Sequence, residues 1–235
     1  MNEWRLIPII QAPGQLQMAI DTWLLEQHRS GSHPPTLRFY TWSPTAISLG
    51  YHQRHYPDAW QSLAWNGGAI NLVRRPSGGR AVLHQGDLTY AVITSGLGQK
   101  RMQAYQAICE FLIQGWKRLG IQLQYGDAGR GYIHNPNCFG TATGADLITL
   151  DGIKLIGSAQ LRREDAILQH GSMQIQTDVE LFEQVFGQPL TLLELSVSIE
   201  TIVETLIDAA RDCFGIDFTI QPLTELEWNQ ITELL

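Results

Sequence analysis

The chain has 235 residues, a length typical of one large domain or of one domain with a small appendage. Hydrophobic residues make up 44% and charged residues 17%, which excludes a disordered polyelectrolyte. Apolar runs fall far short of the roughly 20 residues that span a bilayer, and the first residues lack the pattern of a secretory signal. We therefore expect a cytoplasmic protein without membrane contact.

The net charge of −7 is unevenly distributed. Residues 1–175 hold 15 basic and 11 acidic side chains, whereas residues 176–235 hold one basic side chain, Arg211, and 12 acidic ones. The overall acidity argues against nucleic-acid binding. The basic part could meet an anionic ligand or an acidic partner, and the change in charge suggests a boundary near residue 175.

Periodicity predicts the secondary structure in chain order. The first half contains a helix over 16–27, strands over 36–42, 46–49 and 69–73, a hairpin made from 81–83 and 88–93, and a helix over 102–119 that Gly120 ends. In the second half, Asp151-Gly152 is a hairpin turn between strands over 145–150 and 153–159, and 167–175 is another strand candidate.

The acidic tail is predicted to be helical. One apolar face runs from Ile199 to Phe214 before Gly215, and Thr224 to Glu227 has capping-box form. Strands and helices without strict alternation indicate an α/β protein of the α+β type with a mostly antiparallel or mixed sheet.

The three cysteines differ in context. Cys109 and Cys213 lie on apolar helix faces and are most simply core residues. Cys138 lies in HNPNCFGTATG, a stretch of turn formers, where a thiol is more accessible and more easily activated. It is a candidate nucleophile, and the alternative is an incidental loop thiol. The cysteine spacing excludes a CxxC-type zinc site, and we expect no metal.

Lys154 follows the Asp-Gly turn in a strand of small and apolar residues, IKLIGSAQ. Strict alternation places Lys154, Ile156, Ser158 and Gln160 on one face of this strand. A lysine held at a sheet surface could act as a base or donate to an oxyanion. The alternative is an edge lysine with its ammonium group in water.

The segment from Arg74 to Arg80 joins two predicted strands and contains Gly78 and Gly79. Glycines let the backbone approach a ligand closely, and arginines attract anions. The segment matches neither common nucleotide-binding fingerprint, and the alternative is a solvated turn. The histidines His84 and His170 could belong to a site or to the core. Because GxSxG is absent, the sequence supports no Ser-His-Asp arrangement.

Read together, these segments resemble the biotin/lipoate protein ligase superfamily. The family's glycine-rich signature is similar to residues 74–92, RRPSGGRAVLHQGDLTYAV, and its lysine segment is similar to residues 151–160, DGIKLIGSAQ. Further likeness lies in residues 166–175 (AILQHGSMQI), 18–25 (MAIDTWLL) and 47–53 (ISLGYHQ), so that the resemblance covers almost the whole chain. The GGRAVLH and NCFG segments look most like the cysteine-dependent octanoyltransferases, beside lipoate–protein ligase A.

The resemblance implies a catalytic domain of the class II biotin-synthetase type over residues 1–190, with a small helical C-terminal cap over 191–235. It implies transfer of an octanoyl or lipoyl group from acyl carrier protein to a lysine of a lipoyl domain or of the glycine-cleavage H protein. Cys138 would be the nucleophile and Lys154 the base, without a cofactor. The acyl group would be bound by Arg75, Ser77, Gly78, Gly79, Arg80, His84, Gly157, Ser158, Ala159 and His170.

The apolar chain would need an apolar slot, for which Leu72, Val82, Leu83 and Ile156 are candidates. Arg74, Arg75, Arg80, Arg162 and Arg163 would supply positive charge for a phosphopantetheine arm and for acidic carrier surfaces. Two alternatives remain open at this point. One is a lipoate–protein ligase that uses ATP and Mg²⁺, and the other is a non-catalytic module that binds a carrier.

Overall fold

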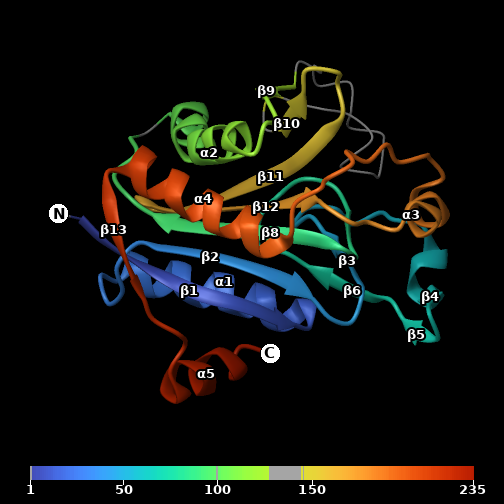
Figure 1. The fold of residues 1–235 in the computed structure, drawn as a ribbon. Helices are drawn as coiled ribbons and strands as arrows, with labels where there is room; N and C mark the ends of the chain where they lie inside the picture. The colour runs from blue at the N-terminus through green and yellow to red at the C-terminus, as the bar shows by residue number, and fades with distance from the viewer. Residues whose placement is uncertain (1, 99, 127–143, 145) are drawn as a thin grey trace.

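The computed structural model describes residues 2–98, 100–126, 144 and 146–235. An eight-stranded mixed sheet runs through this part of the chain, with helices on both faces (Figure 1). Its strands, in spatial order, are β13 (Ile216–Ile220), β1 (Asn2–Ala12), β2 (Thr36–Trp42), β8 (Asp87–Thr94), β12 (Ala166–Gln174), β11 (Lys154–Arg163), β10 (Asp146–Thr149) and β9 (Leu123–Tyr125). Strands β13, β1 and β2 are parallel, and the other neighbouring strands are antiparallel.

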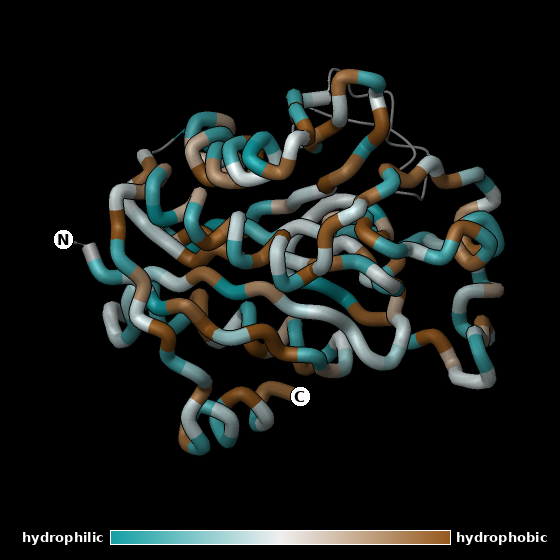
Figure 2. The backbone as a smooth tube through the Cα atoms, viewed as in Figure 1, coloured by the Kyte–Doolittle hydropathy of each residue, from teal (hydrophilic) through white to brown (hydrophobic). Residues whose placement is uncertain are grey.

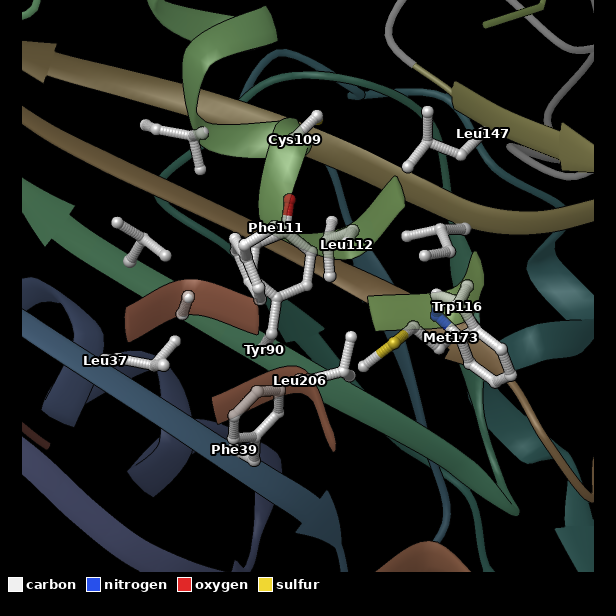
Figure 3. Packing of buried hydrophobic residues seen from close by; sticks show 14 of the residues in the cluster. Leu37, Phe39, Tyr90, Cys109, Phe111, Leu112, Trp116, Leu147, Met173 and Leu206 are labelled. Atoms are coloured by element: carbon white, nitrogen blue, oxygen red, sulfur yellow. The ribbon is translucent and has the colours of Figure 1, made fainter. Parts of the chain in front are cut away.

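One face of the sheet is covered by helices α2 (Arg101–Arg118) and α4 (Ile199–Phe214). The largest apolar core lies between these helices and the sheet. Figure 3 shows that this core brings together Leu112 and Trp116 of α2, Leu206 of α4, and Phe39 and Tyr90 of the sheet. The long apolar faces of both helices supply this packing, as their periodicity predicts.

The opposite face carries α1 (Gly14–Arg29) and the short C-terminal helix α5 (Glu225–Thr232). Trp23 and Leu24 of α1 and Ile231 of α5 belong to a second core on this side. In Figure 2, hydrophobic stretches follow the central strands, whereas α5 alternates between hydrophilic and hydrophobic residues.

A smaller three-stranded sheet has the order β6 (Asn71–Arg74), β3 (Ala46–Leu49) and β7 (Val82–His84). Its own core includes Trp60 of the 3₁₀ helix η1 (Asp58–Ser62) and Phe182 of α3 (Val179–Phe186). Strands β4 (Ala64–Trp65) and β5 (Gly68–Ala69) form a separate ribbon beside it. The small sheet supplies one wall of the cavity described below.

Most predicted elements are confirmed, including the mixed sheet, the long helices and the strands over 36–42 and 46–49. The capping box at Thr224 is present, and Gly215 ends α4 with a φ of 61°. The predicted hairpin over 81–93 is wrong. Strand β7 pairs with β3 in the small sheet, whereas β8 pairs with β2 and β12 in the large one, so the chain changes sheets at Gln85-Gly86.

Strands β1, β9 and β13 and helix α3 were not among the predicted elements. The boundary at residues 190 and 191 stays a prediction. Beyond it, β13 pairs with β1 and α4 packs against α2, so these elements extend the layers built by the rest of the chain. No helix in the described ranges is both long and apolar enough to cross a membrane.

A β-bulge at Leu155 decides which way Lys154 faces. Asp146 pairs with Gly157, Leu147 with Ile156, and Ile148 with Lys154, so that Leu155 is the extra residue of β11. Directly paired residues share a face. Lys154 therefore lies on the face of Gly157, and the predicted face shared by Lys154 and Ile156 is wrong because the bulge reverses the alternation.

Candidate functional site

A narrow cavity lies between the small sheet and the α1 side of the large sheet. We call it the slot, and its walls are mostly apolar. The lining comes from α1, both sheets and the glycine-rich loop: Met18, Tyr40, Trp42, Ser48, Arg75, Gly79, Val82, His84, Thr89, Gly157, Ser158, Ala159, His170, Gly171 and Ser172. A cavity of this kind suits a small, mostly hydrophobic ligand.

The slot crosses four neighbouring strands of the large sheet. Gly157 lies on β11, His170 on β12, Thr89 on β8 and Trp42 on β2. Three strand spacings of about 4.8 Å give a width of about 14 Å from β11 to β2. Trp42 therefore stands at the end of the slot remote from β11, where its ring stacks on His84 at 3.7 Å.

The glycine-rich loop from Arg75 to Arg80 folds around the Arg75 side chain. The buried guanidinium group donates hydrogen bonds to the carbonyl oxygens of Gly78, Arg80 and Ser48, at 2.7–3.2 Å. Arg75 therefore fixes the shape of the loop as well as lining the slot. Arg74 similarly donates to the carbonyls of Gly50 and Gln53, which ties the loop to the segment after β3.

The loop lies directly against the backbone of the small sheet. A Cβ atom at Gly50 would lie 1.9 Å from the Gly79 carbonyl oxygen, a distance that no side chain allows. Gly79 itself has a φ of 97°, which glycine adopts without the strain of other residues. The glycines are thus required by close approach and by conformation.

Two buried Ser–His–Asp hydrogen-bond chains flank the slot. In the first, His170 Nδ1 is 2.8 Å from Asp21 Oδ2, and His170 Nε2 is 2.5 Å from Ser77 Oγ. Asp21 also accepts a hydrogen bond from Tyr40 and lies 3.3 Å from the buried Arg38 guanidinium group. This chain joins the glycine-rich loop through β12 to α1.

In the second chain, His84 Nδ1 is 2.8 Å from Asp87 Oδ2, and His84 Nε2 is 2.8 Å from Ser48 Oγ. Burial lowers the pKa of His84, although the Asp87 carboxylate opposes this shift, so the neutral imidazole is favoured. Asp87 also accepts hydrogen bonds from Ser172 and Thr89. The chain ties the small sheet to β8 and β12.

The sequence supports no Ser-His-Asp arrangement through a local motif, but the structure contains two. The partners lie far apart in sequence, 93 residues for Ser77 and His170, and only the fold brings them together. In both chains the serine is fully buried. Their evident role is to hold the glycine-rich loop and the small sheet over the slot, because each chain links separate elements.

Lys154 lies at the first residue of β11, buried, with its Nζ atom 3.0 Å from Asp146 Oδ1. Both side chains are on the face that carries Gly157, a slot residue. The alternative of an edge lysine in water is therefore wrong. A buried ammonium group needs a partner of opposite charge, and Asp146 supplies it.

The predicted nucleophile Cys138 lies outside the described residues. Of the two cysteines in the described part, Cys109 is buried, and burial raises the pKa of its thiol to about 12. Burial also raises the pKa of the Cys213 thiol. Thiols with raised pKa values are poor nucleophiles, so neither residue is suited to covalent chemistry.

Most other predicted ligand-binding residues meet at the slot. Those that line it are Arg75, Gly79, Val82, His84, Gly157, Ser158, Ala159 and His170. Ser77 is hydrogen-bonded to the lining residue His170, and Gly78 lines a neighbouring groove. Arg80 contributes its carbonyl oxygen to the Arg75 clamp. Leu83 and Ile156 instead pack into hydrophobic cores, and Leu72 lines a different hollow.

Sequence reasoning did not identify Met18, Tyr40 or Trp42 as slot residues. They lie in a helix and a strand whose patterns are those of ordinary core elements. The available signal was Trp42 at the end of a predicted strand, beside two segments that matched the family. Within the described part of the chain, no group of three or more potential ligands could hold a metal ion.

The fold defines an α/β domain with an apolar slot and a buried lysine on the same face of the large sheet. A family model for the lipoyl protein ligase A/B catalytic domain matches residues 13–225, and the chain belongs to this family. The predicted fold class and the family resemblance are thereby confirmed.

The chain is similar to octanoyltransferase LipM of Kyrpidia tusciae, with 35% identity over all of this chain and 96% of the relative. It is 38% identical to octanoyltransferase LipM of Carboxydothermus hydrogenoformans, over 96% of this chain and 84% of the relative. Among solved structures, lipoate-protein ligase A bound with ATP aligns with a TM-score of 0.80 and 24% identity, over 99% of this chain and 94% of that one. This last likeness shows the shared fold.

Proposed function

We propose that the protein is an octanoyltransferase of protein lipoylation. It moves an octanoyl group from acyl carrier protein to a lysine of a lipoyl domain or of the H protein, in the cytoplasm. The observation that carries the proposal is the apolar slot whose β11 wall continues to the buried Lys154–Asp146 pair. The similarity to enzymes named octanoyltransferase LipM supports the same reaction.

In the proposed reaction the Cys138 thiolate attacks the carbonyl carbon of the donor thioester. The bond from that carbon to the donor sulfur breaks, the donor leaves as a thiol, and the acyl group remains on Cys138 as a new thioester. The neutral amine of the acceptor lysine then attacks this thioester. An amide forms, and Cys138 is released as a thiol.

Lys154 acts as the general base and general acid in both steps. It takes the proton of Cys138 to give a thiolate and an ammonium group, and it gives this proton to the departing donor thiolate. In the second step it takes a proton from the acceptor amine and passes it to the departing Cys138 sulfur. The acceptor amine needs such a base, because a free lysine has a pKa near 10.4. The ion pair with Asp146 holds the ammonium form in place on the slot side of the sheet.

The slot positions the acyl chain. Its alkyl part lies toward Trp42 and Met18, and its carbonyl lies toward Gly157 on the strand that carries Lys154. This placement holds the reacting carbonyl carbon at a fixed distance from Lys154. Binding of the alkyl chain thereby accelerates transfer, because it orients the reacting atoms. The reaction needs no metal, nucleotide or other cofactor.

The test is the intact mass of the protein after mixing with octanoyl-acyl carrier protein in the absence of ATP. We expect one added octanoyl group, lost on treatment with hydroxylamine and absent from Cys138→Ser. The variants Cys109→Ala and Cys213→Ser are matched controls that keep the adduct. Lipoyl-domain modification only with added ATP would assign the ligase reaction instead, and no reaction with either would leave a carrier-binding module.

A further inference from the structure

A groove with a positively charged lining adjoins the slot. It lies between the glycine-rich loop, Tyr51 and the outer half of β11. The slot and the groove share Gly79, and along β11 the slot ends at Ala159 where the groove begins at Gln160. A molecule that fills the slot from this side therefore passes through the groove.

Three arginines line the groove, and its lining includes no carboxylate among the described residues. Arg162 Nη1 donates to the Gly98 carbonyl at 2.9 Å, and Arg101 Nη2 donates to the Gln160 carbonyl at 3.0 Å. A backbone carbonyl is a neutral acceptor, so these hydrogen bonds hold the two guanidinium groups in place and leave their positive charge uncompensated. Among the described residues, the carboxylate near Arg163 is that of Glu26, at 3.9 Å.

One nitrogen of a groove arginine lacks a hydrogen-bond partner within the described structure. Arg162 Nη2 is buried and has no hydrogen-bond partner within the described structure, while Nε and Nη1 of the same side chain are held. A buried donor left unpaired is costly, and a phosphate oxygen would satisfy it with a charge-assisted hydrogen bond. The groove is thus arranged for an anion.

The distance from the groove to the lysine fits one type of donor arm. Along β11, Gln160 is about 17 Å from Lys154 at 3.3 Å per residue, because the bulge at Leu155 removes one residue from the span. An extended phosphopantetheine arm has two amide units between its phosphate and its sulfur and spans a distance of this order. With the phosphate in the groove, the thioester reaches the β11 strand beside Gly157 and Lys154.

We infer that the groove binds the phosphate of the donor's phosphopantetheine arm through Arg101, Arg162 and Arg163. The inference rests on the proposed function, because a thioester donor is its ligand. It also gives the acidic donor protein a basic site to approach on a chain whose net charge is −7.

The experiment compares two small probes, octanoyl-4′-phosphopantetheine and octanoyl-pantetheine, which differ only in the phosphate. All proteins carry Cys138→Ala so that the thioester is not consumed, and dissociation constants are measured by calorimetry for the otherwise wild-type chain and for the double variant Arg101→Gln/Arg162→Gln. We expect the wild type to prefer the phosphorylated probe by about tenfold, and the double variant to lose this preference while it keeps its affinity for octanoyl-pantetheine. The matched control is Arg118→Gln/Arg211→Gln, two exposed arginines outside the groove.

Arg162→Lys is a second variant, which keeps the charge and should retain part of the preference. An equal preference in the wild type and the double variant overturns the inference. So does a double variant that binds both probes normally but binds a lipoyl domain more weakly, because the groove would then serve the acceptor. Binding is read without turnover, so a missing acyl-enzyme would refute the proposed function and leave this measurement valid.

Discussion

The Lys154 ammonium group and the Asp146 carboxylate form a buried ion pair, 3.0 Å apart, with side chains that are 6% and 5% exposed. The two residues lie on neighbouring antiparallel strands, and the bulge at Leu155 turns them to the same face. Without the bulge, Lys154 would lie on the face of Ile156, inside the core beneath α2. A local irregularity of one strand therefore determines where the proposed proton carrier stands.

We expect Lys154→Arg to be nearly as inactive as Lys154→Ala. Arginine keeps the positive charge, but its pKa exceeds about 12, so it neither gives nor takes a proton at usable pH. Single-turnover transfer of octanoyl groups to a lipoyl domain measures the loss, which we expect to exceed about 10²-fold. Thermal melts of both variants are the control. A well-folded Lys154→Arg with near-normal transfer would show that Lys154 acts by charge alone.

Asp146→Asn removes the negative charge from the ion pair and leaves a similar shape. Because the ammonium group loses a carboxylate partner, we expect kcat to fall about tenfold or more, with slower alkylation of Cys138 by iodoacetamide at neutral pH. The free energy of unfolding should fall by about 3 kcal/mol, because removing one partner of a buried ion pair is destabilising. Asp151→Asn, an exposed change in the neighbouring turn, is the matched control. Unchanged alkylation would mean that Asp146 has only a structural role.

Trp42→Ala should lengthen the slot at the end remote from β11. Removing the indole ring opens space beside His84, so decanoyl and dodecanoyl groups should be transferred better relative to octanoyl. The measurement is kcat/KM for a series of acyl thioesters. The cavity is expected to cost about 3–5 kcal/mol of stability, so Trp42→Phe provides a milder variant. An unchanged order of chain lengths in both variants would place the alkyl chain elsewhere.

Gly50→Ala tests whether the glycine-rich loop must lie against the small sheet. Its Cβ atom would overlap the Gly79 carbonyl oxygen at 1.9 Å, so the loop must move away from the slot. We expect transfer to fall by about 10² or more, as for other displacements of about 1 Å at a site. Gly68→Ala is the control, because Gly68 is exposed and its nearest neighbour would be 3.7 Å away. Equal activities would contradict the assignment of the loop.

Glu227 should make the stability of the fold dependent on acid pH. Burial by itself raises the pKa of Glu227, but hydrogen bonds from Arg5, the Thr224 N–H and His33 outweigh it and lower the pKa to about 2. A lowered carboxyl pKa stabilises the fold above the unfolded value of 4.5, and this stabilisation is lost as the pH falls from 4.5 toward 2.

We therefore expect Glu227→Gln to lower the free energy of unfolding by about 3 kcal/mol at pH 7. The difference from the wild type should shrink as the pH falls through 4. Urea unfolding at several pH values measures it, and Glu225→Gln at the exposed start of the same helix is the control. A difference that stays constant down to pH 3 would contradict the lowered pKa.

The sequence alone determined the elements whose signals are local. Helix α2 follows from its apolar face and from Gly120 after its end, and α5 follows from the capping box at Thr224. The turn at Asp151-Gly152 correctly predicted that β10 and β11 pair. These features depend on residues within a few positions of one another, and so a linear pattern is enough to find them.

The sequence also singled out most of the slot, because the glycine-rich and lysine segments match the family. Only the tertiary structure decided how they meet. Strand β7 leaves β8 to join another sheet, and Ser77 reaches His170 across 93 residues. Trp42 closes the slot from a strand that looks like any core strand.

The partner of Lys154 was likewise decided by the three-dimensional structure. Alternation predicts its face only for a regular strand, and the bulge at Leu155 appears only in the pairing of β10 with β11. Pairing register, sheet order and buried hydrogen-bond chains are all set by contacts between distant residues. A local pattern gives the tendency of each segment, whereas the burial of polar groups and the packing of the sheets select one arrangement among those tendencies.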